Sequence, residues 1–156
     1  MTVDVRAAAA PADWASAERL IRAYIDSLPF DMSSFQDLDR EMTHLSEEYG
    51  PPSGRALLAS VDGADVGFAG MRRFDEGIAE LKRMYVDPPC RGAGVGRALA
   101  VAAVDAARAL GYRRLVLDTV SRMTAAIAIY EGLGFTPIPP YRHNPLPDAA
   151  YFALDL

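Results

Sequence analysis

The segment VDPPCRGAGVGRALA, residues 86–100, places Arg91 directly before glycines at positions 92, 94 and 96, and an alanine-rich helical pattern follows. Glycine inside a helix costs roughly 1 kcal/mol relative to alanine, so this density of glycine needs a reason. A strand that ends in a glycine-rich turn and leads into a helix presents unpaired backbone N–H groups at the positive end of the helix dipole. Such a turn can bind an anion such as a phosphate. A tight turn whose glycines serve only packing explains the same pattern equally well.

The spacing of the glycines separates this turn from two common phosphate-binding motifs. A Walker A loop carries a Lys-Ser or Lys-Thr pair after its last glycine, and this chain has no such pair there. A dinucleotide fingerprint reads G-x-G-x-x-G, whereas the run here is G-x-G-x-G. The candidate anion-binding residues are Arg91, Gly92, Ala93, Gly94, Val95, Gly96 and Arg97.

Histidine and cysteine offer little for other chemistries. His44 and His143 lie far apart in the sequence, so neither a metal site nor a histidine-based nucleophilic triad is expected. Cys90 is the only cysteine, so no internal disulfide can form and a four-cysteine zinc site is missing. We therefore expect no metal, and the cysteine content fits a reducing, cytoplasmic location.

Hydrophobic spacing predicts the elements that must position the glycine-rich turn. Alternating or continuous apolar runs predict strands, at 2–8, 55–61, 66–73, 77–86, 113–119 and 151–156. The Asp62-Gly63 pair between two of these runs is a strong signal for a hairpin turn. Helical spacing predicts helices, at 11–28, roughly 35–48, 95–110 and 122–133. The proline-rich stretch at 135–149 is expected to be an irregular loop.

This order of elements predicts an α/β (α+β) fold with one mixed sheet and helices on both faces. The chain has 156 residues and is 51% apolar, enough for one core and too short for two. We therefore predict a single domain over residues 1–156. The net charge of −5 weighs against a nucleic-acid partner, because phosphate neutralisation needs a basic face. The sequence contains no apolar run of about 20 residues, so no membrane partner is expected.

The glycine-rich turn and its surroundings resemble the GCN5-related N-acetyltransferase (GNAT) family. The turn has the pattern R-x-x-G-x-G, the strand AELKRMYV precedes it, and the helix AIAIYEGLGF follows in the right order over residues 81–135. The resemblance implies a GNAT-like acyl-CoA N-acyltransferase fold, whose twisted central sheet is mixed and mostly antiparallel. It also implies acetyl-CoA as co-substrate, with its pyrophosphate bound by the amides of residues 91–97.

The resemblance assigns roles to the strand before the turn. Glu80 matches the general base of family members that use a strand-borne glutamate, although an ion pair with Lys82 or an arginine is an equally good interpretation. The backbone N–H of Met84 matches the group that faces the thioester carbonyl. Tyr85 and Val86 would hydrogen-bond the pantetheine arm as an added strand. This arrangement requires the two central strands to separate here.

The resemblance also assigns a role to Tyr130, which the characteristic Gly134-Phe135 pair follows. It matches the family tyrosine whose hydroxyl can protonate the departing thiolate. Without the motif, a core position with the hydroxyl at the rim would be the better interpretation. Many family members carry asparagine seven residues before this tyrosine, and here that position is Met123.

The function that the resemblance implies is transfer of an acetyl group from acetyl-CoA to a primary amine of a small molecule or peptide, by direct attack in a ternary complex. The alternative is a catalytically silent acyl-CoA-binding regulatory module. The sequence does not identify the acceptor, and the resemblance makes a homodimer plausible.

Overall fold

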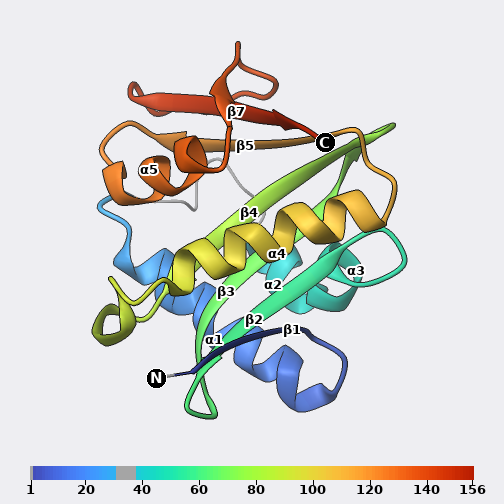
Figure 1. Ribbon diagram of the computed structural model, residues 1–156, viewed down its shortest axis with the longest axis vertical. Coiled ribbons are helices and arrows are strands. Elements are labelled where there is room, and N and C mark those ends of the chain that lie inside the picture. Colours follow the sequence, from blue (N-terminus) through green and yellow to red (C-terminus); the bar gives the residue numbers. More distant parts are fainter. Residues whose placement is uncertain (1, 31–37) are drawn as a thin grey trace.

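The computed structural model describes residues 2–30 and 38–156, and its elements follow the expected order (Figure 1). The strands are β1 (Val3–Ala7), β2 (Arg55–Val61), β3 (Ala64–Asp75), β4 (Ile78–Val86), β5 (Arg114–Val120), β6 (Thr136–Pro137) and β7 (Ala149–Asp155). The helices are α1 (Pro11–Ser27), α2 (Leu38–Thr43), α3 (Leu45–Tyr49), η1 (Pro88–Cys90), α4 (Val95–Ala109) and α5 (Thr124–Gly132). No helix in the described part of the chain is long and apolar enough to cross a membrane.

The seven strands of the described residues form one sheet in the order β1-β2-β3-β4-β5-β7-β6. Every neighbouring pair is antiparallel except β4 and β5, which are parallel. The predicted hairpin joins β2 to β3, and Asp62 and Gly63 both have positive φ angles, of 51° and 87°. A two-residue turn of this kind matches the right-handed twist of the strands. The prediction of a mixed, mostly antiparallel sheet is confirmed.

Helices cover both faces of the sheet, as predicted (Figure 1). α4 lies across one face, where Leu99, Ala103 and Ala107 are fully buried in the larger apolar core. The other face carries α1 and α3, and Leu20 and Ile21 of α1 are fully buried in a second core. Burying a leucine or isoleucine side chain contributes roughly 1.5–3 kcal/mol, so both amphipathic helices are held mainly by their apolar stripes.

The predicted helix at 35–48 is wrong in its continuity. Residues 35–37 lie outside the described residues, and the rest forms two short helices that break at His44, whose φ of −130° is not helical. The Thr43 hydroxyl donates to the Asp39 carbonyl at 3.0 Å, and His44 Nδ1 lies 2.9 Å from the Arg40 carbonyl. Side chains that bond to nearby carbonyls compete with the helical ladder, which ends α2 there.

Candidate active site

The parallel strands β4 and β5 separate after a short paired stretch. Among the described residues they pair only where residues 78–80 meet residues 114–116. Beyond this stretch β4 stays paired with β3, and β5 stays paired with β7, so the two strands diverge (Figure 1). Arg83 has a φ of 61°, and the register between β3 and β4 shifts around it. The separation that the sequence led us to expect is therefore present, at the predicted strand.

A pocket lies in this opening, with a cavity volume of about 60 Å³. Its walls come from β4, β5, α1, α5 and the loop that precedes β7. Its polar lining residues are Lys82, Arg83, Asp118, Thr119 and Asn144, and Met84 and Tyr130 also line it.

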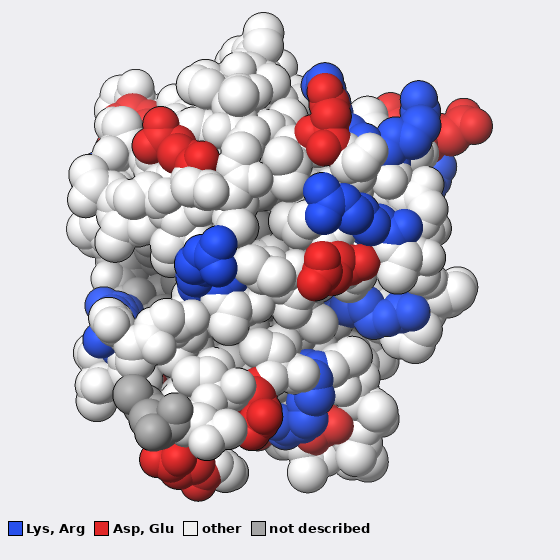
Figure 2. Space-filling view, in the orientation of Figure 1, with Lys and Arg blue, Asp and Glu red and all other residues white. Residues whose placement is uncertain are grey.

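Charges of both signs are interspersed over the face shown in Figure 2, in keeping with the modest net charge.

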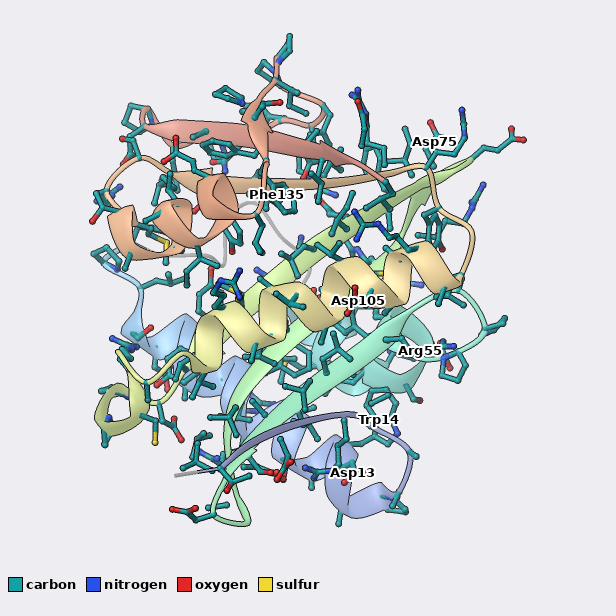
Figure 3. The ribbon with its side chains drawn as sticks, viewed as in Figure 1. Asp13, Trp14, Arg55, Asp75, Asp105 and Phe135 are labelled. Atoms are coloured by element: carbon teal, nitrogen blue, oxygen red, sulfur yellow. The ribbon has the colours of Figure 1, made fainter. Side chains whose placement is uncertain are left out.

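Met84 and Tyr130, which the sequence singled out separately, lie against one another. The Tyr130 hydroxyl donates to Met84 Sδ at 3.9 Å. Phe135, labelled in Figure 3, follows α5 and its ring packs 5.7 Å from the Tyr130 ring. Tyr130 is only 6% exposed, and burial raises its pKa above the ordinary value of 10.0. The hydroxyl therefore keeps its proton near neutral pH and can serve as a donor.

The glycine-rich turn sits at the N-terminus of α4. Gly92 and Gly94 have φ angles of 83° and 84°, a left-handed conformation that other residues adopt only with strain. A Cβ at either position would meet nothing within 4 Å, so backbone conformation selects glycine here. Gly96 differs, because its Cβ would lie 3.0 Å from Ile129 Cδ1 and would crowd the contact between α4 and α5.

The amides of this turn are available to an anion. In the described part of the chain, no hydrogen bond is donated by the backbone N–H groups of residues 92–97. They lie at the positive end of a 15-residue helix, where unpaired donors and the helix dipole both favour negative charge. The residues present therefore fit a pyrophosphate.

Arg91 connects the turn to the end of β4. Its Nε donates to the Val86 carbonyl at 2.9 Å, and its guanidinium lies 5.5 Å from the centre of the Tyr85 ring. Arg91, Tyr85 and Val86 are thus brought together, as a single binding surface would require. Their roles toward a ligand stay predictions.

Glu80 lies in a buried stretch of β4. Its side chain is 0% exposed. Oε1 accepts hydrogen bonds from Arg142 Nη2 at 2.8 Å and from Arg72 Nη2 at 3.2 Å, and Oε2 accepts one from the Tyr141 hydroxyl at 2.7 Å. Glu80 is also missing from the described lining of the pocket. Its predicted role as a base stays a prediction, whereas the ion pairing with arginine is confirmed.

Among the polar pocket residues that sequence reasoning did not single out are Lys82, Asp118 and Asn144. Lys82 is the only lysine of the chain and is 7% exposed, and burial, with the nearby Arg83 charge, lowers its pKa to about 8. The Asp118 carboxylate accepts a hydrogen bond from Asn144 Nδ2 at 3.1 Å. A polar residue near the end of an apolar strand was the available signal for Asp118. Asn144 lies in the proline-rich loop, where no periodicity points to it.

The described residues contain no group of three or more His, Cys, Asp or Glu side chains that could hold a metal ion. His143 follows Tyr141 and Arg142 in the loop before β7, which lies in the proline-rich stretch that the sequence predicted to be irregular. In the structure, Asn144 and Leu146 of that loop line the pocket, while Tyr141 and Arg142 turn toward Glu80.

Comparisons with known proteins give a consistent result. The model of the acetyltransferase (GNAT) family matches residues 17–135. An uncharacterized N-acetyltransferase of Schizosaccharomyces pombe is 32% identical over 156 residues, which covers 99% of this chain and 95% of that protein.

Solved structures show the same fold. A GNAT-family acetyltransferase from Staphylococcus aureus superposes with a TM-score of 0.79 at 18% identity, covering 99% of both chains. A GNAT superfamily phosphinothricin acetyltransferase from Sinorhizobium meliloti, solved in complex with acetyl-CoA, has a TM-score of 0.77 at 22% identity, covering 100% of this chain and 89% of that one.

Proposed function

Because the chain belongs to the acetyltransferase (GNAT) family, we propose that it transfers an acetyl group from acetyl-CoA to a primary amine of a small molecule or peptide. The observation that carries this proposal is the opening between β4 and β5, which holds Met84 and Tyr130 in contact beside the glycine-rich turn. A pyrophosphate on the turn and a thioester in the opening would then lie on one continuous surface.

The chain's own groups can be assigned to the two ends of the co-substrate. The amides of residues 92–97 would hold the pyrophosphate, and the main chain of Tyr85 and Val86 would bond to the arm. Acetyl-CoA supplies the activated acetyl group when it is bound. The Met84 N–H would donate to the carbonyl oxygen, where negative charge develops during attack by an amine.

Proton transfers complete the proposed reaction by direct attack. Tyr130 is the proposed acid for the leaving thiolate, since its buried hydroxyl is protonated and lines the pocket. The acceptor amine must lose a proton as it forms the amide. Glu80 could take that proton only through an intervening group, because its carboxylate is fully buried and both oxygens already accept hydrogen bonds.

An acetyl-CoA consumption screen tests the proposal. Purified protein is incubated with acetyl-CoA and a panel of amino acids, polyamines, aminoglycosides and basic peptides, and free thiol is measured with time. Turnover with at least one amine, and an acetylated product by mass spectrometry, is the expected result. Calorimetry with coenzyme A is run in parallel, and absence of both binding and turnover would overturn the proposal.

The proteins compared above are named as acetyltransferases, so they do not support the alternative of a catalytically silent acyl-CoA-binding module. Tight binding of coenzyme A with no turnover across the panel would be its signature. The same experiment therefore separates the two.

A further inference from the structure

The loop before β7 both lines the pocket and bonds to Glu80, which indicates a structural role for Glu80. This late loop, residues 138–148, lies between β6 and β7 and has no helix or strand. Asn144 and Leu146 of the late loop line the pocket, and Tyr141 and Arg142 of the same loop bond to Glu80. Backbone hydrogen bonds hold the ends of this loop, at Ile138, Leu146 and Asp148, so side-chain contacts are needed to fix the residues between them.

The contacts between Glu80 and the late loop are short and shielded from water. Arg142 Nη2 lies 2.8 Å from Oε1, and the Tyr141 hydroxyl lies 2.7 Å from Oε2, so each carboxylate oxygen holds one residue of the loop. The Tyr151 hydroxyl of β7 donates to the Arg142 carbonyl at 3.0 Å. Burial, and the neighbouring Glu80 charge, raise the pKa of Tyr141, so its hydroxyl stays a donor to the carboxylate.

Charges alternate in sign on either side of Glu80. Arg72 of β3 donates from Nη2 to Glu80 and from Nη1 to Glu48 of α3, at 3.2 and 2.8 Å. The resulting chain Glu48–Arg72–Glu80–Arg142 runs from α3 across the sheet to the late loop. A buried carboxylate is tolerated when its charge is paired and its oxygens are hydrogen-bonded, and both conditions hold here.

We propose that Glu80 is a positioning residue, which fastens the late loop to the central sheet and so fixes the acceptor-side wall of the pocket. The part that concerns the acceptor rests on the proposed function. Each oxygen of the carboxylate is already the acceptor of a bond from the late loop. Protonation would neutralise the carboxylate and weaken its charge-assisted bonds to Arg142 and Arg72, so uptake of the acceptor's proton opposes fastening.

Kinetics of three variants separate positioning from base catalysis, using the panel amine with the highest turnover. For Glu80→Gln, Tyr141→Phe and Arg142→Met we expect the acceptor KM to rise by about tenfold and kcat to stay within about threefold. The KM for acetyl-CoA and the acidic limb of the pH profile should be unchanged. Arg114→Met is the matched control, because it removes an exposed arginine–carboxylate pair between β5 and β7.

The opposite pattern would overturn the inference. A base role predicts that Glu80→Gln alone lowers kcat by about 100-fold or more and removes the acidic limb, while Tyr141→Phe and Arg142→Met keep both. The two loop variants also keep the test decisive if Glu80→Gln does not fold.

Amide hydrogen exchange tests the fastening without any acceptor. In the protein alone, exchange across residues 138–148 should be at least about tenfold faster in Arg142→Met than in the wild type, and unchanged in Arg114→Met. Equal exchange in wild type and Arg142→Met would overturn the inference, whatever the activity. Faster exchange in a protein that acetylates no amine would leave the fastening standing and reject the proposed function.

Discussion

The Tyr130 hydroxyl donates to the Met84 thioether at 3.9 Å, which joins α5 to β4 across the opening of the sheet. Thioether sulfur is a weak acceptor, so this contact holds the hydroxyl in place without binding it strongly. A ligand with a better acceptor can take over the same donor. Met84 and Tyr130, to which the resemblance assigned the carbonyl and the leaving group, therefore line the same pocket in contact with each other.

Tyr130→Phe should lower kcat by about 10- to 100-fold, because the thiolate would leave without a proton donor. The affinity for coenzyme A, measured by calorimetry, should change by less than about threefold, since the ring is kept. Tyr112→Phe is a suitable control, because the Tyr112 hydroxyl donates to the Ser53 carbonyl outside the described pocket. Equal kcat in Tyr130→Phe and wild type would reject the acid role.

Gly94→Ala should weaken coenzyme A binding by about tenfold or more and destabilise the fold by roughly 1–2 kcal/mol. Its φ of 84° is costly for any residue with a Cβ, and a distorted turn would misdirect its amides. Gly132→Ala is the matched control, because Gly132 ends α5 with open space around it and without a positive φ. Calorimetry and thermal unfolding measure both quantities. Wild-type binding by Gly94→Ala would argue against an amide cradle.

Lys82 should titrate near pH 8, well below the ordinary 10.5 of a lysine. Burial and the Arg83 charge disfavour the ammonium, whereas Glu80 favours it; Arg72 and Arg142 disfavour it as well. Because Lys82 is the only lysine, reductive methylation with isotope-labelled formaldehyde adds a single side-chain signal for NMR titration. Lys82→Arg identifies that signal, and a midpoint near 10.5 would contradict the prediction.

The lowered pKa of Lys82 makes the free energy of unfolding depend on pH. Between about 8 and 10.5 the unfolded chain binds more protons at this lysine than the folded chain does, so stability rises with pH in that window. The wild type should therefore gain stability relative to Lys82→Met across it. Urea unfolding at both ends of the window measures the difference, and parallel curves would contradict the assignment.

Arg83→Met should destabilise the protein by roughly 3–5 kcal/mol, because it leaves the buried Glu41 carboxylate without its arginine partner. Arg83 Nε donates to Glu41 at 3.0 Å, and both side chains are less than a tenth exposed. Although burial alone would raise it, the pKa of Glu41 is lowered by the hydrogen bond and charge of Arg83. Stability from this pair is present above the unfolded-state pKa and is lost as acid protonates Glu41.

Arg122→Met provides the comparison for a pair of the same chemistry on the surface. Arg122 bonds to Asp148 through two nitrogens, and its side chain is 45% exposed. Solvent screening should limit the loss to about 1 kcal/mol or less. Equal losses in urea unfolding for the two variants would show that burial does not govern these pairs.

Periodicity alone predicted most of the fold, because each long helix and strand carries its own apolar pattern. The strand at 55–61 and the start of the helix at residue 95 were located to the residue. The break at His44 was missed because it depends on side-chain bonds to carbonyls, which leave no periodic trace. The proposed single domain, homodimer and cytoplasmic location stay predictions.

The candidate site was predictable only in part. The glycine-rich turn and Tyr130 lie within continuous motifs, so the sequence shows them directly. The partners of Glu80 could not be read in the same way, because Tyr141 and Arg142 are 61 and 62 residues away from it along the chain. Only the sheet order, which places β7 next to β5 and its loop over β4, brings them together.

The solitary lysine has a consequence for molecules that meet in solution. All other basic side chains, apart from two histidines, are arginines, and guanidinium groups are far poorer nucleophiles than amines near neutral pH. With Lys82 only 7% exposed, one copy of the protein presents almost no side-chain amine to the acyl donor carried by another. The exterior of the protein therefore offers almost no side-chain amine that the proposed activity could acetylate.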